Sequence, residues 1–408
     1  MNLTKHTLIN LSLVFASLII SLVLAEIALR LAMPEKADHF YSLNDELLLY
    51  RYLPGGDIDQ NGFRNKEILS QYDIIAIGDS QTLGDQAARE EAWPQRLADF
   101  SGLKVYNMAV GGYGPLQYLY LTKNQAFNYK PKLVIWGLYL GNDLFDVHYL
   151  AYEKDPDNNW LEFKDERHQQ KLAELDWPSL EDYFFQEVLP QFKAERQAEI
   201  KSSLIGKLRS YLRQKVKLYA LLGNATRGLR ERLGLATPIK EAIYQSDLSW
   251  ARENPDKGLS YENGDISTIF TPAYRSAALN LDDLRISESL KISLGIFKEV
   301  RDYLEPEGAE FVLAIIPTKE SAYRAQIETD NQSYKQLIAY ENEVRKQILE
   351  YCLIEGINCY NLLPDLQSAL SRGEALYPRH HDGHPLAKGY EVIAQNLFNY
   401  LQSNKIID

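Results

Sequence analysis

The chain has 408 residues, of which 45% are hydrophobic and 25% are charged, an ordinary globular composition. The net charge of -12 excludes the basic footprint of a typical nucleic-acid binder. With only two cysteines, Cys352 and Cys359, the chain is not a disulfide scaffold. This pair is open to two interpretations, a single bridge formed in an oxidising compartment or two buried thiols.

The N-terminal segment is the first strong signal. Residues 7–25 carry no charge and are rich in Leu, Ile and Val, and a membrane-spanning helix needs about 20 such residues. Lys5 precedes this stretch, which predicts a single-pass anchor over 1–33 in the cytoplasmic membrane, with the main domain extracytoplasmic (periplasmic). A signal peptide cleaved after the small-residue site at 23–25 is the alternative, and a buried soluble helix is a third.

Residues 34–68 have no periodicity and include the turn-like pair Asn61-Gly62, which predicts a linker. Strands and helices then alternate, apart from the charged stretch 144–284, which has a mostly helical pattern. This alternation predicts an α/β fold, a three-layer α/β/α sandwich (flavodoxin-like) with a parallel sheet of about five strands. The domain comprises 69–143 and 285–408, with 144–284 as an insertion. Strands are expected at 73–77, 104–110, 133–140, 311–316 and 357–361, and helices at 91–101, 115–129, 285–304, 333–354 and 386–402.

Within the insertion, residues 201–232 contain nine Lys or Arg and a single acid, Glu231, with apolar residues at helical spacing. This basic segment is either a solvated helix face or a surface for anionic lipid, anionic polysaccharide or a protein partner.

Polar residues follow three of the predicted strands, at the sheet edge where α/β proteins form their sites. Gly78-Asp79-Ser80 ends the first strand and places a serine where a helix begins. Gly111-Gly112 ends the second, and glycines let a backbone N–H approach a ligand closely. Gly141-Asn142-Asp143 ends the third, and an Asn amide can donate to an oxyanion.

The segment before the last helix supplies the base that a serine nucleophile needs. It reads His380-His381-Asp382-Gly383-His384-Pro385, and His384 can accept the serine proton while Asp382 orients its ring. Each motif alone is weak, because turns, helix caps and core histidines use the same residues.

Taken together and in this order, the motifs resemble the SGNH/GDSL hydrolase superfamily, named for its Ser, Gly, Asn and His. The resemblance covers 72–143 and 305–402. It implies Ser80 as nucleophile, His384 as base and Asp382 as its partner. The oxyanion hole would comprise the backbone N–H groups of Ser80 and Gly112 and the side chain of Asn142. No metal ion and no cofactor are implied.

The chain departs from the family at the acid, since many members carry it three residues before the histidine, where His381 stands here. The Asp-x-His spacing resembles that of proteins of alginate O-acetylation, although there the pair precedes the serine. Asn61–Arg64 and Pro317–Glu320 also resemble membrane-anchored members near polysaccharide genes. The resemblance therefore implies an esterase or acyltransferase acting on O-acyl, above all O-acetyl, groups of a carbohydrate. Its partners would be the acylated substrate, the membrane and a membrane acyl-donor protein, with no nucleic acid.

Two further hypotheses compete with the serine enzyme. A metal-dependent hydrolase would use His380, His381, Asp382 and His384 as ligands, although neighbours on one short loop rarely converge on one ion. A non-catalytic polysaccharide-binding or assembly factor would retain the fold without the chemistry.

Overall fold

The computed structural model describes residues 42–175, 177–183, 239–264 and 266–407, together with part of 13–26. The chain forms two compact units, one of Met1–Asp38 and Gln191–Ile243, the other of His39–Pro190 and Tyr244–Asp408. The predicted anchor at 1–33 lies mostly outside the described residues, and the basic segment 201–232 lies wholly outside them. Within the described parts, no helix has the length and hydropathy needed to span a membrane.

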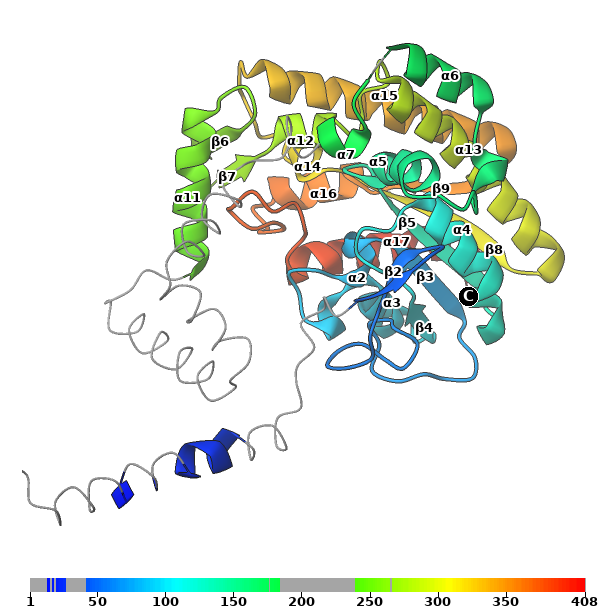
Figure 1. The fold of residues 1–408 in the computed structure, drawn as a ribbon, viewed down its shortest axis with the longest axis horizontal. Helices are drawn as coiled ribbons and strands as arrows, with labels where there is room; N and C mark the ends of the chain where they lie inside the picture. Colours follow the sequence, from blue (N-terminus) through cyan, green and yellow to red (C-terminus); the bar gives the residue numbers. More distant parts are fainter. Residues whose placement is uncertain are drawn as a thin grey trace, which may run out of the picture. The chain divides into compact units, whose positions relative to one another are not determined.

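A five-stranded, all-parallel sheet forms the centre of the larger unit (Figure 1). Its order is β4-β3-β5-β8-β9, so β3, the first of these strands in the chain, lies inside the sheet. The strands are β3 (Ile74–Gly78), β4 (Val105–Asn107), β5 (Leu133–Tyr139), β8 (Glu310–Ile316) and β9 (Asn358–Asn361). The predicted α/β fold with a parallel sheet of five strands is confirmed.

Both faces of the sheet are covered, because successive side chains of each strand enter opposite apolar layers. Ile75 and Trp136 pack into one layer, whereas their neighbours Ile74 and Ile135 pack into the other. The first layer is closed by α4 (Pro115–Asn124) and α13 (Leu284–Leu304), the second by α3 (Trp93–Ser101), α16 (Leu363–Ser371) and α17 (Ala387–Ser403). α15 (Gln332–Glu355) contributes to both layers. Fully burying one such large apolar side chain stabilises the fold by about 1.5–3 kcal/mol.

Residues 42–68 do not behave as the predicted linker. They form the antiparallel hairpin of β1 (Ser42–Asp45) and β2 (Leu49–Tyr52), followed by an irregular stretch packed on the domain. Phe63 is buried, and Arg64 donates to the carbonyls of Leu83 and Gly84 at 3.2 and 2.7 Å. Side-chain hydrogen bonds hold this stretch, so the periodicity that reveals helices and strands is absent from its sequence.

The described part of the predicted insertion contains helices joined by irregular segments and one unpredicted hairpin, β6 (Leu259–Asn263) with β7 (Ile266–Phe270). Its helices include α5 (Asp143–His148), α6 (Glu166–Leu175), α7 (Leu180–Tyr183), α11 (Ile239–Glu253) and α12 (Pro272–Ser276). The backbone of Ile269 in β7 donates to the carbonyl of Arg379 at 2.9 Å. The hairpin is therefore tied to the loop that precedes α17.

The two cysteines form a disulfide between α15 and β9. Of the two interpretations left open by the sequence, the structure has the bridge. Because Cys352 and Cys359 are only seven positions apart, the bridge joins the end of α15 to the edge strand that follows it.

Candidate active site

Ser80 lies at the sharp turn between β3 and α2 (Ser80–Leu83), at the carboxyl edge of the sheet. Asp79 caps this short helix by accepting a hydrogen bond from the Gln81 backbone N–H at 2.8 Å. The turn needs glycine at position 78, because a Cβ there would lie 2.1 Å from Thr82 Oγ1. The local sequence thus places the serine hydroxyl at the end of an inner strand.

The side chains of Ser80, His384 and Asp382 meet at this edge in one hydrogen-bonded line. Ser80 Oγ lies 2.7 Å from His384 Nε2, and His384 Nδ1 lies 2.6 Å from Asp382 Oδ1. Asp382 Oδ1 also accepts the backbone N–H of His384 at 2.9 Å. A carboxylate on Nδ1 favours the tautomer in which Nε2 accepts the serine proton.

The charges in this line depend on each other. Burial opposes ionisation of Asp382, yet the hydrogen bonds and charge of His384 hold the pKa of Asp382 well below its usual range. Burial also favours a neutral His384, but the hydrogen bond and charge of Asp382 raise the pKa of the imidazole above its usual 6.5. The ring is consequently a stronger base than a free histidine, which suits proton transfer from a hydroxyl.

Two backbone N–H groups beside Ser80 have no acceptor in the described part of the chain, those of Ser80 itself and of Gly112. The Gly112 φ angle is 77°, a conformation that favours glycine. Two tyrosines of β2 brace this turn: Tyr50 donates to the Gly111 carbonyl, and Tyr52 Oη accepts the Gly111 N–H at 3.1 Å. Sequence reasoning missed both tyrosines because it assigned them to a linker.

Asn142 also lines the site, but its amide has a partner. Its Nδ2 donates to Asp146 Oδ2 at 2.6 Å, and because an amide nitrogen carries two hydrogens, that bond uses one of them. Burial raises the pKa of Asp146 well above its usual value, and the nearby charge of Asp79 adds to this. Asp146 is therefore held towards its neutral form.

A cavity of about 250 Å³ opens over these groups. It brings together the predicted Ser80, Gly112, Asn142 and His384, and Gly141 of the same predicted motif as Asn142, with residues that the sequence did not single out. The latter are Tyr139, Phe145, Asp146, Tyr274, Arg275 and Ala278. Asp382 lies behind His384.

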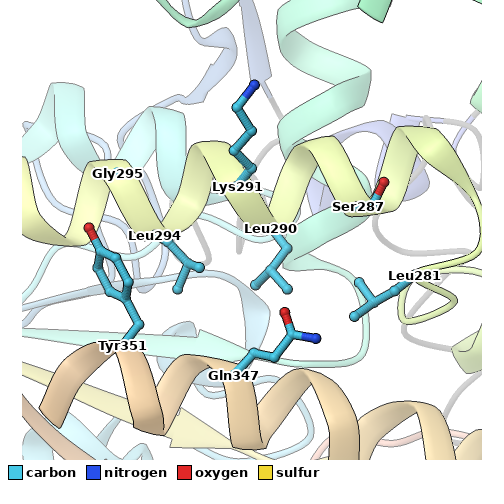
Figure 2. Close-up of a pocket in the computed structure, with 8 residues that line it drawn as sticks. All are labelled: Leu281, Ser287, Leu290, Lys291, Leu294, Gly295, Gln347 and Tyr351. Atoms are coloured by element: carbon cyan, nitrogen blue, oxygen red, sulfur yellow. The ribbon is translucent and has the colours of Figure 1, made fainter. Parts of the chain in front are cut away.

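A larger groove of about 500 Å³ lies between α13 and α15 (Figure 2). Leu290 and Leu294 point from α13 into it, and the hydroxyl of Ser287 donates to the Leu284 carbonyl at 3.1 Å. Among the described residues that line it, none is a histidine, so its serine lacks a base. The groove is lined by Leu281, Ser287, Leu290, Lys291, Leu294, Gly295, Gln347 and Tyr351.

The loop that carries Asp382 and His384 is held by a buried cation. Lys319, which is 1% exposed, donates through Nζ to the carbonyls of Pro378 and His380, each at 2.7 Å. The same ammonium reaches the Ile269 carbonyl at 3.3 Å. This residue belongs to the Pro317–Glu320 motif, which the sequence marked without indicating what it does.

The four residues proposed as metal ligands do not converge. His384 is hydrogen-bonded to Ser80 and Asp382 to His384, whereas His381 Nδ1 lies 2.5 Å from Asp247 Oδ2. Ligand atoms of Asp247, His380 and His381 come within 4.8 Å of one another, which is a different set. The predicted set of four metal ligands is therefore wrong, because His384 is hydrogen-bonded to Ser80 and Asp382 to His384.

Comparisons with known proteins give distant structural similarities. No family model matches the chain, and no curated protein matches it. A G-D-S-L family lipolytic protein from Desulfitobacterium hafniense DCB-2 is 13% identical, with coverage of 80% of this chain and 98% of that one and a TM-score of 0.32. An acetylxylan esterase from Geobacillus stearothermophilus, solved as a catalytic mutant, is 9% identical, with 82% and 95% coverage and a TM-score of 0.35. The α/β hydrolase LAE5 from the Lake Arreo metagenome is 10% identical, with 82% and 97% coverage and the same TM-score. Similarity at this level carries no argument, so the chemistry rests on the geometry of the site.

Proposed function

We propose that this chain is an SGNH-type serine esterase or O-acyltransferase that forms an acyl-enzyme on Ser80. The observation that carries the proposal is the line from Ser80 through His384 to Asp382, which opens on a cavity beside two unpaired backbone N–H groups. A nucleophile, a base and an oriented acid are the parts that acyl transfer requires.

In the first half-reaction, Ser80 Oγ attacks the ester carbonyl carbon while its proton passes to His384 Nε2. The carbonyl oxygen becomes an oxyanion that the N–H groups of Ser80 and Gly112 stabilise, with the second N–H of Asn142 as a third donor. Each well-placed donor lowers the barrier by about 3 kcal/mol. The C–O bond to the alcohol then breaks, and His384 returns the proton to the leaving oxygen.

In the second half-reaction, His384 accepts a proton from water or from a sugar hydroxyl as that oxygen attacks the acyl carbon. Collapse releases a carboxylic acid or a new ester, and Ser80 regains its proton. Hydrolysis and transfer therefore differ only in which hydroxyl reaches the acyl-enzyme.

We further propose an O-acetylated extracytoplasmic carbohydrate as substrate, with the chain held at the membrane by residues 1–33 and served by a membrane acyl-donor protein. Support comes from the uncharged segment 7–25 and from the Cys352–Cys359 disulfide, because structural disulfides persist mainly outside the cytosol. A membrane-fractionation assay with and without residues 1–33 tests the location.

A fluorophosphonate probe tests the chemistry directly, since it labels activated serines. We expect labelling of wild type and of Ser403→Ala, a change at an exposed serine at the end of α17, and none of Ser80→Ala. Hydrolysis of acetylated sugars should fall by at least about 10³-fold in Ser80→Ala. A folded wild-type protein that neither takes the probe nor cleaves any ester would overturn the proposal.

A further inference from the structure

Arg275 is a buried cation with no role in the acyl transfer proposed above. Its residue is 8% exposed, and its guanidinium carbon lies 4.4 Å from the ring centre of Tyr274 and 5.4 Å from that of Tyr139. Across the described parts of the chain, no acceptor or carboxylate pairs with the guanidinium, and Nε is fully enclosed without a partner. A guanidinium has five N–H donors, and burying them without acceptors is unfavourable.

This guanidinium lies at the catalytic edge of the cavity. It lines the same space as Ser80 and His384. One of its terminal nitrogens lies 2.9 Å from the point that a Cβ on Gly383 would occupy, and Gly383 stands between Asp382 and His384 in the chain. The unpaired N–H donors of Arg275 therefore lie beside Gly383, the residue that directly precedes the proposed base, His384.

A second unpaired donor lies at the same place. The hydroxyl of Tyr139 is enclosed and has no hydrogen-bond partner within the described residues. It lies 3.2 Å from the same point above Gly383. Arg275 and Tyr139 thus present donors to one corner of the cavity, which we name the Arg275–Tyr139 corner.

The acids around this corner do not pair with the guanidinium. Asp382 accepts from His384 and, through Oδ2, from Gln86 Nε2 at 2.8 Å. Glu320 Oε1 accepts the Thr271 backbone N–H at 2.9 Å, and its Oε2 is enclosed without a hydrogen-bond partner among the described residues. Burial opposes the charge of Arg275, but the neighbouring Tyr139 and Tyr274, followed by the carboxylates of Glu320 and Asp382, raise the pKa of the guanidinium above its usual value. The corner therefore holds a charged donor group that a ligand can satisfy.

We infer that the Arg275–Tyr139 corner binds a carboxylate of the substrate, so that the preferred substrates are esters carrying a carboxylate near the scissile bond. The inference rests on the proposed function, because it places this carboxylate beside an ester attacked by Ser80. A guanidinium fork matches a carboxylate through two parallel hydrogen bonds, and the hydroxyl of Tyr139 can add a third. The carboxylate belongs either to the acyl group, as in a hemiester of a dicarboxylic acid, or to the sugar, as in an O-acetylated uronic acid.

Matched pairs of esters test the inference and separate the two sources. The first pair is mono-p-nitrophenyl succinate against p-nitrophenyl acetate, and the second is O-acetylated methyl glucuronide against O-acetylated methyl glucoside. In wild type we expect kcat/KM to favour the charged member of one pair by about 10- to 100-fold. A preference in the first pair assigns the carboxylate to the acyl group, and one in the second assigns it to the sugar.

Variants locate the preference at the corner. Arg275→Met should bring the ratio of kcat/KM values close to one, Arg275→Lys should keep part of it, and Tyr139→Phe should lower it several-fold. Arg252→Met, at an exposed arginine of α11, should leave the ratio unchanged. Equal rates for charged and neutral esters in wild type, or an unchanged ratio in folded Arg275→Met, would refute the inference.

A binding measurement keeps the test independent of turnover. Succinate or methyl glucuronide should raise the Tm of Ser80→Ala protein, methyl glucoside should not, and Arg275→Met in the same background should abolish the shift. If Ser80 takes the fluorophosphonate probe but kcat/KM shows no preference for charged esters and carboxylates do not raise Tm, the inference is refuted and the proposed serine chemistry is retained. If carboxylates raise Tm through Arg275 but Ser80 does not take the fluorophosphonate probe, the proposed serine chemistry is refuted and the carboxylate site is retained.

Discussion

A methyl group added at Gly112 would test how the Gly111–Gly112 turn shapes the site. The φ angle of 77° places an alanine there in the left-handed region, which destabilises the fold by about 1–2 kcal/mol. The new Cβ would also lie 2.5 Å from Tyr50 Oη, so the tyrosine must shift and lose its hydrogen bond to the Gly111 carbonyl. That loss adds about 1 kcal/mol.

The turn carries one of the proposed oxyanion donors, so activity should fall with stability. We expect Gly112→Ala to lower the free energy of unfolding by about 2–3 kcal/mol and kcat/KM by about 10²-fold. Gly102→Ala is the matched control, because Gly102 has φ of 69° and open space around its Cβ position. Gly102→Ala should lose only the stability that an alanine in the left-handed region costs, and it should keep full activity.

A double variant separates the clash from the backbone strain. Tyr50→Phe removes the oxygen at 2.5 Å and leaves the ring carbon at 3.9 Å, an ordinary contact. Added to Gly112→Ala, it should recover part of both stability and kcat/KM, as urea unfolding and p-nitrophenyl acetate turnover would show. The reasoning is refuted if Gly112→Ala behaves like Gly102→Ala, or if Tyr50→Phe recovers neither quantity.

Three further predictions follow from the residues around the site. Because His384 must be neutral to act as the base, kcat/KM should fall as pH drops, with a midpoint above pH 6.5. Asp382→Asn should move this midpoint to lower pH and reduce kcat by about 10⁴-fold. An unchanged midpoint in that variant would contradict the pairing of Asp382 with His384. Lys319→Met leaves three carbonyls without their donor and should lower the free energy of unfolding by about 3 kcal/mol along with kcat; unchanged urea unfolding would contradict its anchoring of the loop. Reducing Cys352–Cys359 should lower that free energy by about 2.5 kcal/mol, and thiol titration before and after reduction identifies the bridge.

The sheet could be predicted because its strands are short apolar runs. Ile74–Gly78 and Leu133–Tyr139 are buried at every position, as expected of parallel strands covered on both faces. The meeting of Ser80 with His384 followed from the same topology, since residues after parallel strands share one edge of the sheet. Chain order and one structural rule therefore brought together two residues 304 positions apart.

The rest of the site left no pattern in the sequence. Arg275 reaches the cavity from a short helix, and the groups that enclose it, Tyr139 and Gly383, are more than a hundred positions away in either direction. Tyr50 and Tyr52 act through hydroxyl contacts with one glycine, a pairing that hydrophobic periodicity does not encode. Such tertiary contacts emerge only once the fold has set the spacing between segments.

The bracing of Gly111 by β2 sets a limit on where the chain can be cut. The sequence places the start of the domain at residue 69, so a fragment begun there retains Ser80, Asp382 and His384. It loses the hydroxyls of Tyr50 and Tyr52 that fix the neighbouring turn. Such a truncated protein would keep its nucleophile and base, but the Gly111–Gly112 turn, whose N–H is proposed to bind the oxyanion, would no longer be held in place.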